Sequence, residues 1–139
     1  MKRTFLLLFT ISLFSGIFAQ NETKMEDNSK KLAVLWTSGD VDVAEKMCFM
    51  YTYNAKKQGW FDEVVLIVWG PSAKLLSENK NLQDYVKKMK EAGIIVEACV
   101  ACARMYGVDE DLAKMGIDVK GMGTPLTKYI QDGWKTLSL

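Results

Sequence analysis

The sequence contains no histidine among its 139 residues. This absence excludes Ser-His-Asp and Cys-His catalysis, His-ligated zinc sites and His-based pH switches. There is also little excess charge, because 18 Lys and Arg residues against 17 Asp and Glu residues give a formal net charge of +1. Such a balance gives no reason to expect nucleic acid or an anionic membrane surface as a partner. Cysteine is scarce, with three residues, so each one is considered separately.

The N-terminus has the pattern of a targeting segment. Lys2 and Arg3 precede an apolar run over residues 5–18, and the small Ala19 stands before Gln20. A run of about 14 residues is shorter than the roughly 20 needed to span a bilayer. We therefore predict a signal peptide over residues 1–19, cleaved near Ala19, and export, most simply to a periplasm. The alternative is an uncleaved membrane anchor; after cleavage we expect no membrane span.

The rest of the chain divides into two parts. Residues 20–30 are polar, which predicts a flexible lead-in. Residues 31–139 have the length and composition of one globular domain. The sequence therefore predicts a single folded unit in which any functional site has to be built.

Strand and helix patterns alternate along this domain. Apolar runs predict strands over 31–37, 63–69, 94–98, 119–122 and 134–139, and the segments between them predict helices over 43–57, 71–78, 81–92, 109–115 and 124–131. In the first helix, an apolar stripe is expected to face the core and comprises Val43, Met47, Met50, Tyr51 and Asn54. The order predicts an α/β fold with a mostly parallel five-stranded sheet that helices cover on both faces.

Polar and glycine-rich turns follow several of the predicted strands. Ligands of open parallel sheets bind outside the carboxyl ends of the strands, so we expect these turns to meet at one edge. The predicted site-lining residues are Ser38, Gly39, Asp40, Trp69, Gly70, Pro71, Ser72, Met122 and Gly123. Trp36 and Trp69 are candidate stacking groups for a planar ligand, although core or interface packing is the commoner role of tryptophan.

Cys99 lies at the end of the third predicted strand, where a helical turn begins. Backbone N–H groups at a helix start favour a thiolate, the nucleophilic form of cysteine. Cys102 follows one helical turn later, within reach of the first thiol. Arg104 can add positive potential, whereas Cys48 falls inside a helix and is expected to pack in the core. Cys99 is the predicted catalytic residue and Cys102 a possible resolving thiol.

Several other roles compete for this Cys-x-x-Cys pair. Zinc usually needs four ligands, and Cys48 alone is left to join the pair, so no metal is expected. A structural disulfide would close a very small loop and constrain the unfolded chain little. A thioredoxin-like fold is disfavoured because the motif follows the third strand and 14 residues follow Pro125. Dithiol redox chemistry and simple packing of two small residues both stay open.

The segment EACVACARMYGV at 97–108 resembles the cysteine segment of the DsrE/DsrF-like family, which includes TusD-type sulfur-relay subunits. Three further stretches resemble single-domain members of this family: WTSGD at 36–40, which leads into AEKM at 44–47; LIVWGPS at 66–72; and MGTPL at 122–126. The resemblance covers essentially all of residues 31–139. It implies a flavodoxin-like three-layer α/β/α fold and a homo-oligomer, either dimer, trimer or hexamer.

The resemblance also implies that Cys99 matches the family cysteine that carries sulfur as a persulfide. TusD-type proteins have a non-thiol residue at the position of Cys102, while many other DsrE-like proteins share the pair. We therefore expect a sulfurtransferase-type carrier without a cofactor, whose partners are sulfur donor and acceptor proteins or small sulfane-sulfur compounds. The cytoplasmic pathways of the family do not fit an exported chain. Two alternatives stay open: a non-catalytic ligand-binding or partner-binding module, and a periplasmic dithiol oxidoreductase.

Overall fold

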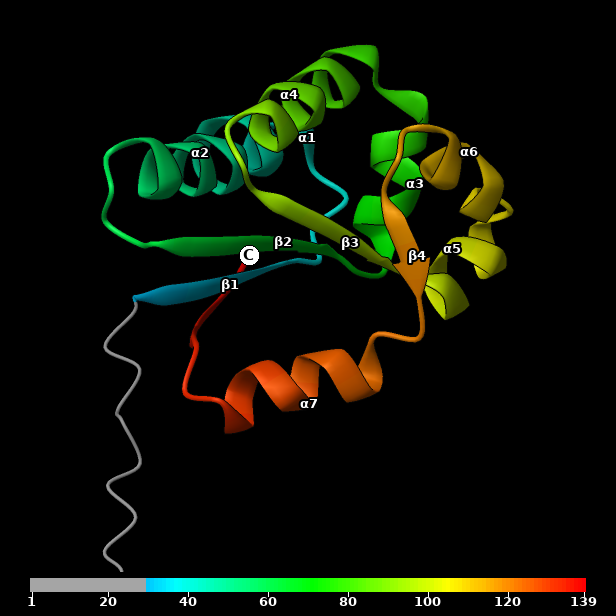
Figure 1. Cartoon of the computed structure of the whole chain (residues 1–139). Helices are drawn as coiled ribbons and strands as arrows, with labels where there is room; N and C mark the ends of the chain where they lie inside the picture. Colours follow the sequence, from blue (N-terminus) through cyan, green and yellow to red (C-terminus); the bar gives the residue numbers. More distant parts are fainter. Residues whose placement is uncertain (1–29) are drawn as a thin grey trace, which may run out of the picture.

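The computed structural model describes residues 30–139, and these residues form a five-stranded parallel sheet with helices on both faces (Figure 1). The predicted signal peptide and nearly all of the predicted lead-in lie outside the described residues. The strands are β1 (Lys31–Trp36), β2 (Glu63–Val68), β3 (Ile95–Cys99), β4 (Asp118–Lys120) and β5 (Lys135–Ser138). Their order across the sheet is β4-β3-β2-β1-β5, which confirms the predicted parallel α/β fold.

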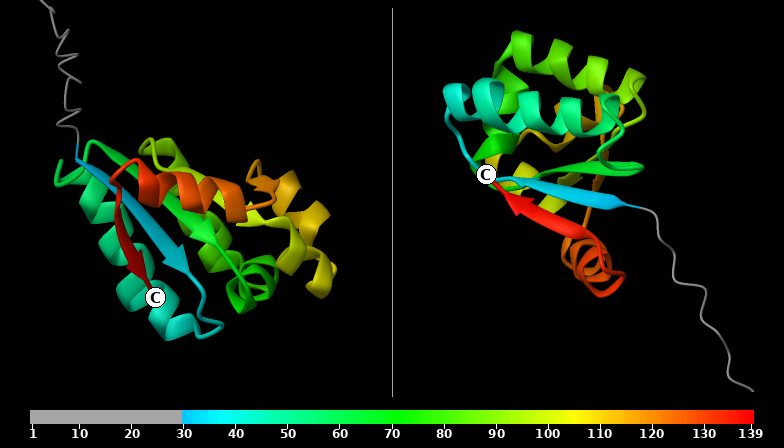
Figure 2. Two further views of the ribbon diagram at one scale, coloured as in Figure 1. Left: turned by 90° about the horizontal axis from the view of Figure 1, so that it is seen from below. Right: turned by 90° about the vertical axis from the view of Figure 1, so that its left-hand side faces the viewer.

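The helices are divided unequally between the two faces. Between β1 and β4 the chain forms α1 (Val41–Val43), the π-helix η1 (Ala44–Phe49), α2 (Met50–Lys57), α3 (Pro71–Glu78), α4 (Lys80–Glu91), α5 (Val100–Tyr106) and α6 (Asp109–Lys114). These helices pack with one face of the sheet, and α7 (Gly123–Gln131) lies alone under the other (Figures 1 and 2). Right-handed crossovers explain this, because β1 to β4 step in one direction and the β4–β5 connection returns in the opposite one.

Alternate side chains of each strand enter two separate cores. On β2, Val64, Leu66 and Val68 join the larger core, together with residues of α2 to α6. Val65 and Ile67 point the other way and pack with Cys99 and Met122 in a smaller core under α7. The last five residues of β2 are all buried, which is the pattern of a strand in a sheet covered on both sides.

The apolar stripe predicted for residues 43–57 is on the wrong side of the helix. Met47, Met50 and Tyr51 are 54%, 51% and 38% exposed, while Val43 and Asn54 are half-buried. The buried side chains are Ala44, Cys48, Phe49, Thr52 and Ala55. Two physical causes explain which side is buried. The π-helical turns rotate the following residues relative to an α-helical pattern. Small side chains on the buried side let the helix lie close to the sheet.

Phe49 supplies the bulk on this buried side, with its ring edge against Trp36 at 4.8 Å between centroids. Trp36 is therefore a core residue and is not open to a ligand. Cys48 is fully buried, as expected for a core residue, and burial raises the pKa of its thiol to about 12. Within residues 30–139, no helix is long and apolar enough to cross a membrane.

Candidate functional site

The topology of the sheet indicates one position, at the carboxyl ends of two neighbouring strands, where a ligand is expected to bind. Strand β3 is followed by α5 on the side of the larger core, whereas the neighbouring strand β4 is followed by α7 on the opposite side. Ligands of open parallel sheets bind where the connections of two adjacent strands leave in opposite directions, at the carboxyl ends of those strands. Cys99 and Lys120 are the last residues of β3 and β4 and are paired in register, so this switch point is at Cys99.

The Cys99 and Cys102 thiols interact at this switch point. Cys99 is the residue just before α5, with 5% of its surface exposed, and Cys102 is half-buried one turn further on. Both are free thiols. Burial raises the pKa of Cys102, and a hydrogen bond with Cys99 and the negative charge of that residue raise it further. Burial and the neighbouring Cys99 thiol therefore favour the protonated form of Cys102.

Gly70 contributes its backbone to the thiol pair. Its N–H group bonds to the Cys102 sulfur and lowers the pKa of that thiol, in opposition to burial. Gly70 has φ of 75° and ψ of −136°, a conformation that residues with a side chain rarely adopt. The glycine therefore permits the turn after β2 that brings this N–H group to the sulfur.

An apolar shell surrounds the two thiols. Trp69, half-buried after β2, and Met122, fully buried before α7, pack in the same small core as Cys99 and Cys102. Gly123 opens α7 and is exposed. Of the predicted lining residues, Trp69, Gly70 and Met122 are thus placed with the cysteines.

The other predicted lining residues shape the loops after β1 and β2. The carboxylate of Asp40 caps α1, accepting from the Asp42 and Val43 N–H groups at 2.8 and 3.0 Å. The Ser38 hydroxyl accepts from the Asp40 N–H group at 3.1 Å. These contacts give both residues a structural role in the turn.

Ser72 and Gly39 join the ends of β1 and β2. The buried Ser72 hydroxyl donates to the Trp36 carbonyl at 2.6 Å and accepts from the Trp69 N–H group at 3.0 Å. A Cβ atom on Gly39 would lie 3.1 Å from Cβ of Pro71, so the glycine allows the two loops to approach closely. Gly39 and Pro71 line a shallow hollow of about 260 Å³ with Tyr106, outside the apolar shell of the thiols.

A buried polar cluster under the same strand was not predicted. Glu97 is 4% exposed and lies two positions before Cys99, so the two side chains share one face of β3. Its Oε1 accepts from Lys120 Nζ at 2.7 Å, and its Oε2 accepts from the Tyr129 hydroxyl at 3.2 Å. Lys120 also donates to Asp118 at 2.5 Å. A charged residue in an otherwise apolar predicted strand was the available signal for this cluster.

The charges of this cluster affect one another. Hydrogen bonds to Asp118 and Glu97 raise the pKa of Lys120. Burial and the negative charge of Glu97 raise the pKa of Tyr129 to about 12, so the tyrosine stays protonated and donates. Arg104 is separate from the cluster: it is largely exposed and pairs with Asp109 at 3.3 Å. Among the described residues, no group of three or more acidic or cysteine side chains is arranged to hold a metal ion.

Comparison with known proteins identifies the family to which this chain belongs. Residues 30–139 match the model of the DsrE/DsrF-like family, and the chain belongs to this family. Membership in it suggests a sulfur-relay-type protein. An uncharacterized protein of Methanocaldococcus jannaschii, MJ0733, is 31% identical over 97 residues, which cover 65% of this chain and 75% of the relative.

Two solved structures share the fold. A conserved protein of unknown function from Bacteroides thetaiotaomicron, BT1422, is 38% identical with a TM-score of 0.77 and covers 83% of this chain and 98% of its own. The ychN protein from E. coli is 12% identical with a TM-score of 0.65, covering 79% of this chain and 99% of its own. The family-model match confirms the predicted family, and the two solved structures share the predicted α/β fold.

Proposed function

We propose that this protein carries sulfane sulfur on Cys99 as a persulfide, taking it from a donor and passing it to an acceptor. The observation that carries the proposal is the interaction of the Cys99 and Cys102 thiols at the carboxyl end of β3, where the connections after β3 and β4 leave in opposite directions. The sulfur-relay character of the family supports the same chemistry. Neither a histidine nor a metal is required, because the attacking group is a thiolate.

Loading is an exchange at sulfur. The Cys99 thiolate attacks the terminal sulfur of a donor persulfide, R–S–SH, and the donor's S–S bond breaks. The products are Cys99–S–SH and the donor thiolate, R–S⁻, so no external oxidant is consumed. The raised pKa of Cys102 suits this step, because Cys102 keeps its proton and donates it toward the Cys99 sulfur.

Unloading has two routes. An acceptor thiolate can attack the outer sulfur of Cys99–S–SH, which transfers that sulfur and restores the Cys99 thiolate. Alternatively, the Cys102 thiolate attacks the inner sulfur, which releases HS⁻ and leaves a Cys99–Cys102 disulfide that an external dithiol must reduce. The Gly70 N–H group favours the second route, because it stabilises negative charge on Cys102. Cys102 thus acts as the resolving thiol.

The apolar shell has a protective role in this proposal. Trp69 and Met122 exclude water from the thiol pair and so limit the loss of a reactive persulfide. The carrier works in an exported compartment, as the N-terminal pattern of residues 1–19 predicts. Its donor and acceptor are proteins or small sulfane-sulfur compounds.

The loading step is tested by intact-mass spectrometry after exposure to a sulfane-sulfur donor such as an inorganic polysulfide. The Cys102→Ser variant should gain the mass of one sulfur atom and keep it. The wild type should gain this mass and then lose it as the Cys99–Cys102 disulfide forms, and Cys99→Ser should never gain it. Cys48→Ala is the matched control and should load like the wild type, because Cys48 is fully buried. Equal loading of Cys99→Ser and wild type would refute the assignment.

The hydrogen bond between the two thiols also favours a second function, a dithiol oxidoreductase. In that case, the Cys99–Cys102 disulfide itself oxidises a substrate dithiol. A measured reduction potential and turnover of a dithiol substrate without added sulfane sulfur would separate it from the carrier. A binding module would instead keep its ligand in a Cys99→Ser/Cys102→Ser double variant.

A further inference from the structure

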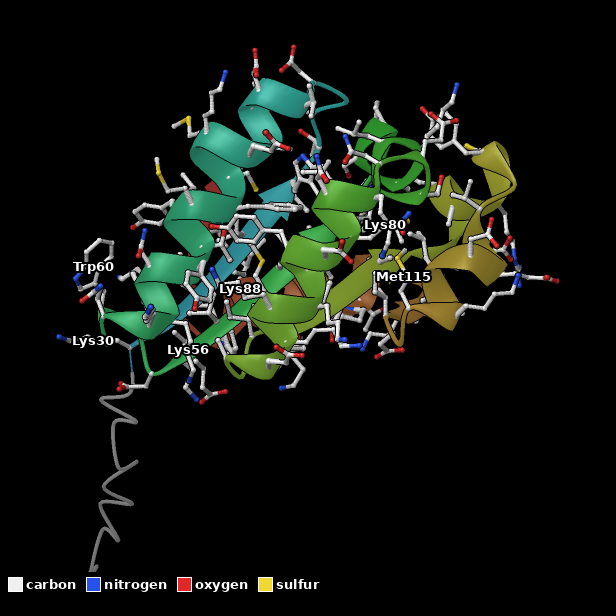
Figure 3. All side chains as sticks on the ribbon, turned by 90° about the horizontal axis from the view of Figure 1, so that it is seen from above. Lys30, Lys56, Trp60, Lys80, Lys88 and Met115 are labelled. Atoms are coloured by element: carbon white, nitrogen blue, oxygen red, sulfur yellow. The ribbon has the colours of Figure 1, made fainter. Side chains whose placement is uncertain are left out.

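A hollow of about 260 Å³ lies between α3 and α5, near the thiol pair. It carries charged groups that have no part in the proposed sulfur transfer. Its lining residues are Pro71, Lys74, Leu75 and Glu78 of α3, Tyr106 of α5, and Gly39 of the loop after β1. The two helices lie side by side (Figures 1 and 3), and Lys80, labelled in Figure 3, begins α4 directly beyond α3.

Both walls of the hollow lead to the thiols. On α3, Pro71 follows Gly70, whose N–H group bonds to the Cys102 sulfur. On α5, Tyr106 lies four residues after Cys102, so these two side chains share one side of the helix. A Cβ atom on Gly70 would meet no atom within 4 Å beyond its chain neighbours, so the space beside this glycine is open. The hollow therefore adjoins the pair of Cys102 and Cys99.

Lys74 and Glu78 give the hollow one positive and one negative group. Their closest nitrogen and oxygen atoms are 4.0 Å apart, beyond hydrogen-bond distance, and the side chains are 56% and 63% exposed. An exposed pair of this kind contributes little to stability, so both groups can turn toward a ligand. Since the two charges cancel, the hollow suits a ligand that has both an ammonium and a carboxylate group, and it offers no net attraction to a dianion such as thiosulfate.

Size and spacing restrict the ligand further. The volume of about 260 Å³ is below the roughly 300–1,000 Å³ of sites for drug-sized molecules, so the hollow suits a molecule the size of one amino acid. Along α3, Lys74 and Glu78 lie about 4.5 and 10.5 Å beyond Pro71 at a rise of about 1.5 Å per residue. An amino acid bound between these charges can therefore direct its side chain to the Pro71 end, near the thiols. The half-exposed Tyr106 forms the opposite wall.

We propose that this hollow binds the persulfide of a small amino acid, such as cysteine persulfide, as the sulfur donor for Cys99. Glu78 accepts hydrogen bonds from the donor's ammonium group, and Lys74 donates to its carboxylate. The outer sulfur points past Gly70 to Cys99. The Cys99 thiolate attacks this sulfur and the donor's S–S bond breaks, so the products are Cys99–S–SH and the thiolate of the amino acid. The inference rests on the proposed function and adds the chemical class of the donor.

Loading kinetics of the full chain test the hollow, in a Cys102→Ser background where the persulfide persists. The concentration of cysteine persulfide that gives the half-maximal loading rate should rise about tenfold in Lys74→Gln and in Glu78→Gln, because each variant loses a charge-assisted hydrogen bond. Lys128→Gln is the matched control and should load like the parent protein. It breaks a similar exposed ion pair, with Asp132 at 2.9 Å, on α7 under the opposite face of the sheet.

Donors that lack one of the two charges separate the two contacts. Mercaptopropionate persulfide has no ammonium group, so Glu78→Gln should not weaken its loading, whereas Lys74→Gln should. Cysteamine persulfide has no carboxylate, so the two variants should have the opposite effects on it. This comparison isolates each pair of groups in the manner of a double-mutant cycle. Equal weakening of all three donors by both variants would overturn the assigned contacts.

Inorganic polysulfide distinguishes this inference from the proposed function. It has neither an ammonium nor a carboxylate group, so both variants should still load Cys99 from it, which also shows that they are folded. If polysulfide loads Cys99 while neither variant weakens loading from cysteine persulfide, the donor site is wrong and the persulfide chemistry stands. If neither donor loads Cys99, the proposed function fails, and calorimetry with the unreactive S-methylcysteine tests the hollow alone. Binding to the wild type that is weakened about tenfold in Glu78→Gln supports the site, and no binding overturns it.

Discussion

Tyr129 of α7 donates its hydroxyl proton to the carboxylate of Glu97 on β3, two residues before Cys99, at a distance of 3.2 Å. This bond links the single helix on the α7 side of the sheet to the strand that carries the reactive thiol. No residue of α7 is fully buried, so α7 is held by half-buried side chains and by this polar contact. The Tyr129–Glu97 bond therefore helps to hold α7 against the small core that contains Cys99 and Met122.

Replacing Tyr129 by Phe removes this contact with little change in shape. One oxygen of the buried Glu97 carboxylate then lacks a donor, which should lower the free energy of unfolding by about 1–3 kcal/mol. Urea denaturation measures the change. Thr127→Ala is the control on the same helix, since the exposed Thr127 hydroxyl bonds to the Gly123 carbonyl, and it should cost less than about 0.5 kcal/mol. Equal decreases in the free energy of unfolding would show that the Tyr129–Glu97 bond stabilises the fold no more than the Thr127–Gly123 bond does.

Asp40 is among the predicted site-lining residues, and its carboxylate caps the N-terminus of α1. Asp40→Ala should lower the free energy of unfolding by about 0.5–2 kcal/mol, because the Asp42 and Val43 N–H groups lose their acceptor. Sulfur loading of Cys99 should stay at the wild-type level below the unfolding transition. A loading defect in a folded Asp40→Ala protein would instead place Asp40 in the site.

The raised pKa of Cys48 predicts that the fold loses stability in alkaline solution. Its pKa is about 12 in the fold against about 9 for a free thiol, so above pH 9 the unfolded chain binds fewer protons than the folded one. The free energy of unfolding must therefore fall as pH rises from 9 toward 12, by about 1.4 kcal/mol per pH unit at most for this group. The raised pKa of Tyr129 acts in the same direction above pH 10.

The Cys48→Ala variant checks this pH dependence. It lacks the titrating thiol, so its free energy of unfolding should fall less steeply between pH 9 and 10 than that of the wild type, although it is less stable at every pH because of the cavity. Urea titrations at a series of pH values give both slopes. Identical slopes would mean that Cys48 does not titrate differently in the two states.

Cys102 is predicted to control the release of sulfide. In the wild type loaded with sulfur, attack by Cys102 on Cys99–S–SH should release one sulfide per disulfide formed. In Cys102→Ser, the persulfide should persist and sulfide should appear only after an acceptor thiol is added. A sulfide-specific probe measures both. Spontaneous sulfide release by Cys102→Ser at the wild-type rate would remove the resolving role of Cys102.

The order of strands and the position of Cys99 were predictable from sequence because buried parallel strands are continuous apolar runs between turns. The buried side of residues 43–57 was not, because a π-helical turn breaks the periodicity on which the prediction relies. Met47 and Met50 lie on the exposed side of this helix. Hydrophobicity alone does not distinguish a core residue from an exposed apolar one.

The site was predictable in part. Trp69, Gly70 and Met122 follow strand ends, and the parallel sheet places them around the thiols. Ser38, Asp40 and Ser72 also follow strand ends, but their hydrogen bonds are to backbone groups of the loops and strand ends. Glu97 in an apolar predicted strand was a local signal for the polar cluster, but its partners Lys120 and Tyr129 lie on two other elements, and no local pattern identifies them.

The most direct test of the central claim is the sulfur state of Cys99 in protein recovered from its native cells. Peptide mass spectrometry after rapid alkylation should find one extra sulfur atom on the peptide that contains Cys99, located on that residue by fragmentation. The Cys48 peptide of the same sample is the internal control and should carry none. Persulfide on Cys99 is the result we predict. Extra sulfur found only on Cys102, or on neither residue, would contradict the proposal.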